Sequence, residues 1–174
     1  WTRYIPHRPT AKQIAFLLLD QREALYGGAA GGGKSDALLM AALQHVDKAD
    51  YAALLLRKTY ADLSLPGALM ERAKEWLMPT DAIWRDTSKT WHFPSGATLT
   101  FGYLDQTGAE YRYQSTEFQF IGFDELTQFT ENQYRYLFSR LRRRADMDIP
   151  LRMRSASNPG GVGHEWVRQR FIDS

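Results

Sequence analysis

A glycine-rich stretch near the start of the chain has the residue types and the spacing of a phosphate-binding loop. Gly28, Gly33, Lys34 and Ser35 fit the pattern G-x-x-x-x-G-K-[ST]. Glycines let a backbone turn several amide groups toward one phosphate, and the N-terminus of a following helix adds the positive end of its dipole. Lys34 would then reach the β- and γ-phosphates of a nucleotide, and the Ser35 hydroxyl would bind Mg²⁺. The residues expected to bind nucleotide here are Gly28, Ala29, Ala30, Gly31, Gly32, Gly33, Lys34 and Ser35.

The segments on either side of this loop are those that such a site needs. Residues 23–26 favour a short strand, and residues 36–43 favour a helix that is apolar on nearly every side and therefore buried. A flexible glycine linker is the alternative, but a linker does not require Lys-Ser followed by a buried helix. The stretch therefore predicts a nucleotide site.

Two adjacent carboxylates follow a second apolar segment. Residues 118–123 favour a strand, and Asp124 and Glu125 come directly after it. Asp124 could hold Mg²⁺ through the water molecules of the metal, and Glu125 could polarise a water molecule for in-line attack on the γ-phosphate. A solvated strand end is the alternative for this pair alone. Together with the phosphate-binding loop, the pair predicts ATP hydrolysis.

Asn158 and Gln13 are candidates for two further contacts with the nucleotide. Asn158 follows a predicted strand at residues 151–156, where a polar side chain can sense the γ-phosphate and report its loss. A simple Asn-Pro turn is the alternative for Asn158. The amide of Gln13 offers both a donor group and an acceptor group, which matches the edge of adenine, although a lone glutamine on a helix is more often solvated.

Phosphoryl transfer also calls for an arginine, because negative charge builds on the equatorial oxygens. The loop itself has alanine at its early positions and supplies none. Arg112, in the polar segment before the Asp-Glu pair, is the first candidate, and the alternative is a solvated charge. The competing candidates are Arg140, Arg142, Arg143 and Arg144.

Basic residues elsewhere could contact DNA. Arg57 and Lys58 follow a predicted strand at residues 51–56 and precede a hydroxyl and an aromatic side chain, a combination that can grip a nucleic-acid backbone and stack on a base. An ordinary exposed strand end is the alternative. The arginine cluster at residues 140–144 is a candidate for contacts with DNA phosphates or with a neighbouring subunit, and the sequence leaves these two open.

Composition sets the broader limits. The chain has 174 residues, of which 44% are hydrophobic and 24% charged, as is typical of one globular domain. No apolar run approaches the roughly 20 residues of a membrane span, and we expect no secretory leader. The absence of cysteine excludes disulfides and thiolate metal sites and fits an intracellular protein. The four histidines lack metal-ligand spacing.

The remaining periodicities predict an α/β fold with a mainly parallel sheet and helices on both faces. We expect a helix after Thr10 that runs to about Leu19 with Ile14, Leu17 and Leu18 on its inner face, and a helix after Thr130 with a capping box to Gln133 and an apolar stripe from Tyr134 to Leu141. The other expected elements are a helix from 66 to 78, a hairpin from 91 to 103, a loop from 106 to 114 and a last helix from 164 to 172.

Taken together, these motifs resemble the ATPase domain of the large terminase subunit, the motor with which tailed bacteriophages pack DNA into capsids. The resemblance covers nearly the whole chain, and its last part, residues 164–173, is similar to the segment that leads such domains toward their nuclease. The motifs that carry it are Arg8-Pro9 to Gln13, the loop from Gly28 to Ser35, residues 56–60, the turn at residues 93–96, Asp124-Glu125 and Ser157-Asn158-Pro159-Gly160.

The resemblance implies an additional-strand, catalytic-glutamate P-loop NTPase that uses ATP and Mg²⁺. It implies a homo-oligomeric ring that acts on double-stranded DNA with the portal protein and the small terminase subunit, in the host cell cytoplasm at the procapsid portal and without membrane contact. By the same likeness, Gln13 binds adenine, Lys34 and Ser35 bind phosphate and Mg²⁺, and Asp124 binds Mg²⁺. Glu125 activates water, while Asn158 couples hydrolysis to movement. Arg112 is not carried over from the family, and on the residues alone we count it with Lys34 and Glu125 as catalytic.

Two departures from the family pattern qualify this picture. Many relatives carry a basic residue early in the loop, where this chain has Ala29 and Ala30, and this favours an arginine supplied by a neighbouring subunit. Residues 1–174 would form the ATPase domain of a longer protein whose nuclease domain follows Ser174, so we expect no DNA cleavage from this chain.

Two other classes of protein share some of these features. A superfamily-two helicase or translocase shares the adenine glutamine, the loop and the Asp-Glu pair, but it needs a second motor domain to complete its site. A nucleotide-regulated DNA-binding or assembly module would not need the water-activating Glu125.

Overall fold

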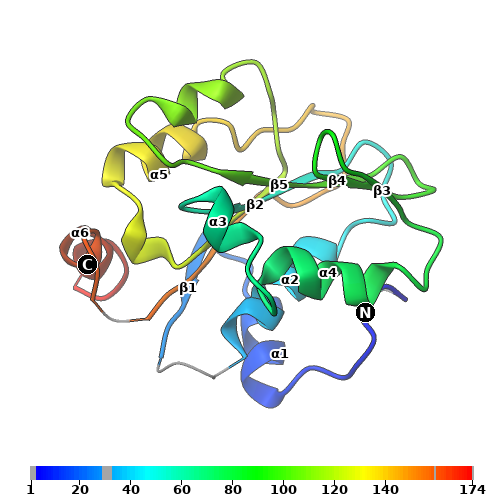
Figure 1. Cartoon of the computed structure of the whole chain (residues 1–174), viewed down its shortest axis with the longest axis horizontal. Coiled ribbons are helices and arrows are strands. Elements are labelled where there is room, and N and C mark those ends of the chain that lie inside the picture. The colour runs from blue at the N-terminus through cyan, green and yellow to red at the C-terminus, as the bar shows by residue number, and fades with distance from the viewer. Residues whose placement is uncertain (1–2, 29–32, 159, 174) are drawn as a thin grey trace.

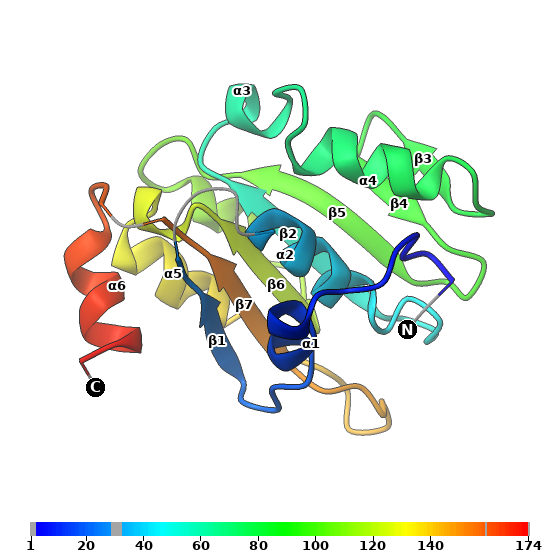
Figure 2. The same ribbon diagram turned by 90° about the horizontal axis from the view of Figure 1, so that it is seen from below.

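The computed structural model describes residues 3–28, 33–158 and 160–173, and within them one mixed sheet runs through the centre of the molecule. The strand order across this sheet is β1-β7-β6-β2-β5-β4-β3 (Figure 2). The strands from β1 to β5 in this order are parallel, whereas β4 pairs antiparallel with both of its neighbours, β5 and β3. The strands are β1 (Glu23–Tyr26), β2 (Ala52–Arg57), β3 (Ile83–Arg85), β4 (Thr90–His92), β5 (Thr98–Tyr103), β6 (Phe120–Asp124) and β7 (Arg152–Ala156).

Helices cover both faces of the sheet, as the sequence predicts (Figure 1). The helices α1, α2 and α4 pack on one face, and α5 and the 3₁₀ helix η1 pack on the other. Because successive side chains of a strand point to opposite faces, Ala53 and Leu55 of β2 join the first core, whereas Leu54 and Leu56 join the second. The helices are α1 (Ala11–Leu17), α2 (Lys34–Leu43), α3 (Tyr60–Leu63), α4 (Leu69–Leu77), η1 (Ala109–Tyr113), η2 (Leu126–Gln128), α5 (Glu131–Phe138) and α6 (His164–Phe171).

Helix α2, which follows the glycine-rich loop, is almost completely buried. Each residue from 37 to 43 exposes 3% of its surface or less. A Cβ added to Gly122 of β6 would lie 2.6 Å from the Leu55 side chain and 3.2 Å from that of Leu38 on α2. Glycine at position 122 therefore lets α2 pack closely on the sheet, and this contact fixes the start of α2 beside the end of β6.

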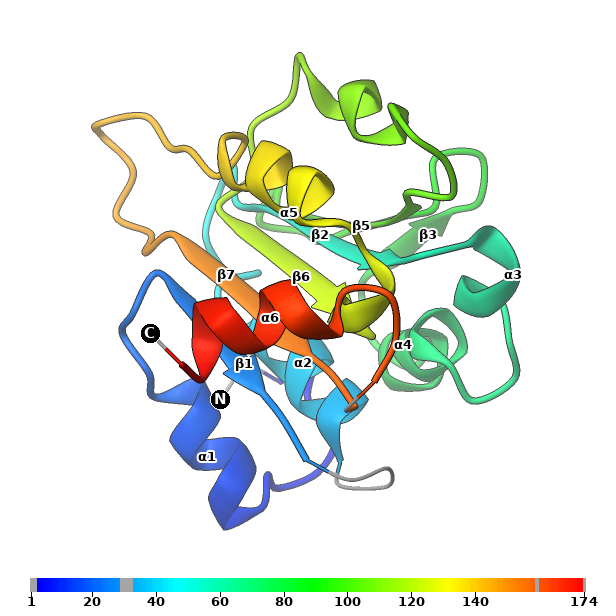
Figure 3. The same cartoon turned by 90° about the vertical axis from the view of Figure 1, so that its left-hand side faces the viewer.

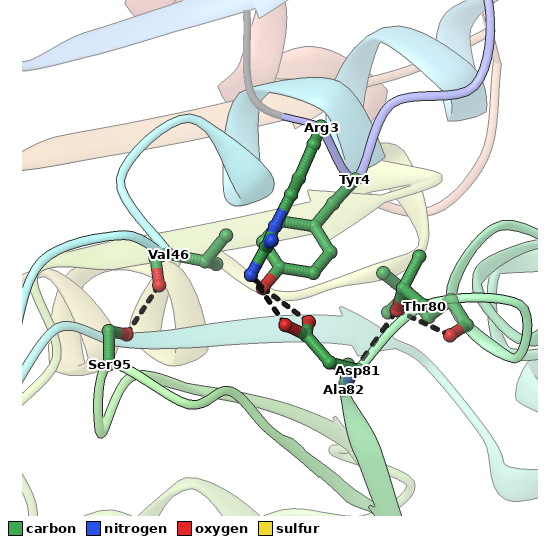
Figure 4. A network of polar contacts seen from close by, with 8 residues as sticks. Arg3, Tyr4, Val46, Thr80, Asp81, Ala82 and Ser95 are labelled. Carbon is green, nitrogen blue, oxygen red and sulfur yellow. Dashed lines mark hydrogen bonds and ion pairs between the residues drawn. The ribbon is translucent and has the colours of Figure 1, made fainter.

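The N-terminal segment is tied to the loop that precedes β3. The Tyr4 hydroxyl donates a hydrogen bond to Asp81 Oδ1 at 2.7 Å, and the Arg3 guanidinium pairs with Asp81 Oδ2 (Figure 4). The Tyr4 ring also packs edge-on against Phe93, with 5.0 Å between ring centroids. These contacts hold the chain across the molecule just before it enters α1.

The last helix, α6, is attached to the strand that leads into the glycine-rich loop (Figure 3). Arg170 of α6 donates two hydrogen bonds to Glu23 of β1, at 2.7 and 3.1 Å. Tyr134 of α5 donates a third to the same carboxylate at 2.8 Å. Trp166 adds a hydrogen bond to the Phe129 carbonyl at 3.0 Å. One carboxylate thus joins β1, α5 and α6.

Several boundaries differ from the sequence-based expectation. Helix α1 ends at Leu17, and the expectation that Leu18 faces inward is wrong, because Leu18 is 76% exposed and Phe16 fills the core instead. Leu141 lies beyond α5 and forms an isolated bridge with Phe118, so the apolar stripe of that helix is shorter than expected.

Three short elements had no clear signal in the sequence. The strand β3 extends the predicted hairpin of β4 and β5, the one-turn helix α3 follows β2, and η1 lies within the segment expected to be a loop. Within the described residues, no helix has both the length and the apolar composition to cross a lipid bilayer.

Candidate active site

The carboxyl ends of β1, β6 and β7 meet at one edge of the sheet and bring the predicted functional groups together. The glycine-rich loop follows β1, the Asp124–Glu125 pair ends β6, and Asn158 follows β7. Ligands of open α/β sheets bind at this edge. A pocket of about 490 Å³ opens there, and its lining residues are Gly33, Lys34, Ser35, Asp36, Gly67, Arg72, Glu125 and Asn158.

The end of the phosphate-binding loop requires glycine. Gly33 is the N-cap of α2 and has a φ of 72°, in the left-handed region that glycine adopts without strain. A Cβ at this position would also lie 2.8 Å from Gln13 Nε2. Lys34 Nζ donates a hydrogen bond to the Gly28 carbonyl at 3.2 Å, so the lysine lies along the loop. The predicted phosphate contacts of Ala29, Ala30, Gly31 and Gly32 fall outside the described residues.

Gln13 connects α1 to this loop. Its Oε1 accepts a hydrogen bond from the Thr10 amide at 2.9 Å, and its Nε2 donates one to the Gly33 carbonyl at 3.0 Å. The Thr10 hydroxyl accepts a hydrogen bond from the Gln13 amide and completes a capping box at the start of α1. Only 4% of Gln13 is exposed. The adenine contact of Gln13 stays a prediction.

Asp124 lies where a metal-binding carboxylate is expected. It is 3% exposed, its Oδ1 accepts a hydrogen bond from Ser35 Oγ at 3.4 Å, and its Oδ2 pairs with Arg57 at 3.2 Å. Burial raises the pKa of Asp124 above its ordinary value, and the positive charge of Arg57 opposes that rise.

The oxygen atoms of Ser35 and Asp124 fit Mg²⁺, which binds proteins through one or two carboxylates and takes its remaining ligands from water and phosphates. A site built only from protein side chains is not expected for such a metal. The described part of the chain has no group of three or more His, Asp or Glu residues that could hold a metal ion.

Glu125 has an unusual backbone conformation for a residue with a side chain. Its φ is 58° and its ψ is 57°, a left-handed conformation that costs about 1–2 kcal/mol outside glycine. This turn lets the chain leave β6 sharply and directs Glu125 into the pocket, where its Oε1 accepts a hydrogen bond from Asn158 Nδ2 at 3.4 Å. Backbone strain of this kind collects at functional sites. Asn158 Oδ1 is buried and has no hydrogen-bond partner among the described residues.

The sequence analysis does not predict the place of two arginines at this site. Arg72 of α4 lines the pocket and donates a hydrogen bond to Asp36 at 2.7 Å. The sequence places Arg57 at a DNA contact, but only 14% of its side chain is exposed and it pairs with Asp124. The positions of both arginines depend on how α4 and β2 pack beside the loop, and the residue pattern does not predict this packing.

Arg112 lies in a different pocket. It donates a hydrogen bond to the Tyr103 carbonyl at 2.9 Å, and its guanidinium lies 4.9 Å from the centre of the Tyr103 ring. Tyr60 and Lys89 line the same pocket, which shares no lining residue with the pocket beside Lys34. The described chain therefore does not bring Arg112 to its own phosphate-binding loop.

The other predicted DNA or subunit contacts are also away from this pocket. The cluster from 140 to 144 lies in the connection before β7, and therefore at the opposite end of the strands from Asn158. Arg140 donates a hydrogen bond to the Gln114 carbonyl, and Arg143 donates one to the Ile149 carbonyl. Arg144 forms ion pairs with Asp50 and Asp146, and Arg142 is exposed. Lys58 donates a hydrogen bond to the Gln133 side chain.

The fold and this arrangement can be compared with known proteins. The large terminase of a thermophilic bacteriophage in complex with ADP has a TM-score of 0.69 and 20% identity, over 94% of this chain and 42% of that one. The HK97 bacteriophage large terminase has a TM-score of 0.66 and 12% identity, over 87% of this chain and 33% of that one. The N-terminal domain of the DNA packaging ATPase from bacteriophage phi29 has a TM-score of 0.59 and 16% identity, over 83% of this chain and 76% of that one. No curated protein matches the chain in sequence.

These likenesses show the P-loop NTPase fold of large terminase ATPase domains, with β7 as the additional strand between β1 and β6. The chain spans less than half of the length of the two large terminases. A family model described as the T4likevirus-type terminase large subunit, N-terminal, matches residues 25–166, which include the glycine-rich loop and the Asp-Glu pair. Since this match covers most of the chain, the chain belongs to the family of T4likevirus-type terminase large subunits and carries the N-terminal part of such a subunit.

Proposed function

We propose that this chain binds and hydrolyses ATP, and that it does so as the motor domain of a viral packaging enzyme. The observation that carries the proposal is the meeting of Lys34, Ser35 and Glu125 in one pocket at the carboxyl edge of the sheet. Structures with the same fold were solved with ADP and with ATP-gamma-S bound, which supports a nucleotide in this pocket.

In this proposal the phosphate chain of ATP lies over the start of α2. The amides of the loop and the positive end of the α2 dipole stabilise its negative charge, and Lys34 leaves the Gly28 carbonyl to contact the β- and γ-phosphates. Ser35 and Asp124 would hold Mg²⁺, which would neutralise the charge that develops on the phosphates.

Glu125 acts as the general base of this reaction. It accepts a proton from the attacking water while the bond to the leaving ADP breaks, and the products are ADP and phosphate. Asn158 orients the Glu125 carboxylate through its amide nitrogen. Its Oδ1, which has no partner among the described residues, is an acceptor for the same water or for a group that moves when phosphate leaves. In this proposal Asn158 couples hydrolysis to movement.

The larger assembly follows from the family. We propose that the chain acts in a homo-oligomeric ring on double-stranded DNA, with the portal protein and the small terminase subunit, in the host cell cytoplasm. The phi29 relative is a DNA packaging ATPase, which supports this role. Arg112 of one subunit would complete the site of the next, because its pocket is separate from the phosphate pocket of its own chain.

The test of the hydrolytic role is Glu125→Gln, which keeps the shape of the side chain and removes the base. We expect binding of a fluorescent ATP analogue to stay near the wild-type level and single-turnover hydrolysis to fall about 100-fold or more. The matched control is Glu117→Gln, an exposed carboxylate outside the pocket. Hydrolysis at the wild-type rate in the Glu125 variant would remove this residue from the mechanism.

A further inference from the structure

Arg72 is the arginine that the described chain brings to the phosphate pocket. It comes from α4, which packs beside α2, and it lines the pocket together with Lys34, Ser35 and Glu125. Gly67, in the turn before α4, lines the same pocket and has a φ of 76°. The start of α4 is therefore part of the pocket wall.

Asp36 holds the Arg72 guanidinium at this wall. The bond from Arg72 Nη1 to Asp36 Oδ1 is 2.7 Å long, and Asp36 lies in the first turn of α2, next to Ser35. The Arg72 side chain is 39% exposed and that of Asp36 is 17% exposed, so the arginine reaches the open part of the pocket. A guanidinium has five N–H donors, and the described contacts with Asp36 use one of its nitrogens.

The local charges favour an anion opposite Arg72. The positive end of the α2 dipole and Lys34 already point to this region, and Glu125 faces the same pocket. A nucleoside triphosphate brings several negative charges, and a guanidinium binds phosphate oxygens in a fork that an ammonium cannot provide. The terminal phosphate is the part of the nucleotide that lies near Glu125 if that residue activates the attacking water.

We propose that Arg72 contacts the terminal phosphate of ATP from within the same chain, and that Asp36 is the residue that positions it. This inference rests on the proposed ATP site. It supplies the pocket with a same-chain arginine that the loop itself lacks, since alanine occupies its early positions. It leaves Arg112 available for a neighbouring subunit.

The test compares the affinities for ATP-γ-S and ADP, measured by displacement of a fluorescent nucleotide. A contact with the terminal phosphate is present only with the triphosphate. Arg72→Gln should therefore lower the affinity for ATP-γ-S about tenfold or more and change the affinity for ADP by less than about twofold. Arg72→Lys should restore part of this loss, because it keeps the charge. Asp36→Asn should also lower the affinity for ATP-γ-S more than the affinity for ADP, but by a smaller factor than Arg72→Gln.

The control on the same helix is Lys74→Gln, which lies in a separate pocket with Trp84 and Trp91 and should keep both affinities. Thermal unfolding of each variant shows that the fold is kept. Equal losses for ATP-γ-S and ADP in Arg72→Gln would overturn the terminal-phosphate contact, and so would wild-type affinities.

Lys34→Ala separates this inference from the proposed function. If Lys34→Ala abolishes binding of both nucleotides and Arg72→Gln changes neither, the ATP site stands and the role of Arg72 is wrong. If Lys34→Ala binds both nucleotides normally, the proposed site itself is wrong. Mixing Arg72→Gln with Glu125→Gln should not restore hydrolysis, and a restored rate would place Arg72 in the neighbouring subunit's site instead.

Discussion

Arg57 and Asp124 form an ion pair of 3.2 Å at the ends of two neighbouring strands, β2 and β6. The side chains are 14% and 4% exposed, so water screens this pair only weakly. The carboxylate that is expected to bind Mg²⁺ thus has a positive partner from its own chain. The same arginine joins the predicted metal ligand to the segment that continues into α3.

Removal of Arg57 should destabilise the protein more than removal of an exposed arginine. Arg57→Ala leaves a buried carboxylate without its charge partner, and we expect the free energy of unfolding to fall by about 3 kcal/mol. The comparison is Arg144→Ala, which breaks exposed pairs with Asp50 and Asp146 and should cost about 1 kcal/mol or less. Chemical denaturation measures both values, and equal losses in the two variants would contradict the structural difference.

Gly33→Ala should damage both the fold and nucleotide binding. Alanine at position 33 would have to adopt a left-handed backbone conformation, at a cost of about 1–2 kcal/mol. Its Cβ would also displace the Gln13 side chain from the Gly33 carbonyl. The stability control is Gly27→Ala, because a Cβ there meets no atom within 4 Å. Denaturation curves give the stability of each variant and titration with fluorescent ADP gives its affinity. Similar stability for the two variants would mean that the turn tolerates a side chain.

His45 should make the protein less stable in mild acid. It packs edge-on against Tyr51, and burial lowers the pKa of its imidazole below the ordinary value. The unfolded chain therefore takes up a proton more readily than the folded chain, and stability falls as the pH drops from above the unfolded pKa, about 6.5, toward the lowered folded pKa. His45→Gln should flatten the loss of unfolding free energy between about pH 7 and pH 5. Urea denaturation across this range measures it, and an unchanged pH dependence would assign the loss to other groups.

Arg112→Ala should separate nucleotide binding from hydrolysis. Since Arg112 lies outside the phosphate pocket of its own chain, we expect ATP affinity to stay nearly constant while hydrolysis by the assembled protein stops. Mixed with Glu125→Ala, it should regain part of the activity, because mixed assemblies contain sites with one intact Arg112 and one intact Glu125. The measurement is phosphate release at increasing protein concentration, and the absence of rescue at any ratio would count against a shared site.

The sequence predicts the parts of this molecule that depend on local patterns. Alternating and helical periodicity located β1, β2, β6, β7 and most helices, and the loop pattern with the Asp-Glu pair located the edge at which they meet. Capping also followed local rules, since Thr130 and Gln133 form the expected capping box. Asn158 lies beside Glu125 because β7 and β6 are neighbouring parallel strands, and the residue pattern alone does not give this strand order.

The parts that could not be predicted depend on tertiary packing. Nothing near Arg72 in the sequence marks it, because its place in the pocket arises from α4 packing beside α2. The sequence predicts a DNA contact for Arg57, with an exposed strand end as the alternative, and only the neighbouring strand β6 shows that Arg57 faces Asp124. Gln13 looked like a free amide, yet Gly33 and Thr10 take both of its polar atoms.

The position of β7 sets the distance between β1 and β6. Neighbouring strands lie about 4.8 Å apart, so the strand inserted between β1 and β6 separates these two strands by about 10 Å. Helix α2 packs against both β7 and β6 and brings Ser35 Oγ within 3.4 Å of Asp124 Oδ1. The width of one extra strand is thus the span that the chain crosses between β1 and the carboxylates at the end of β6.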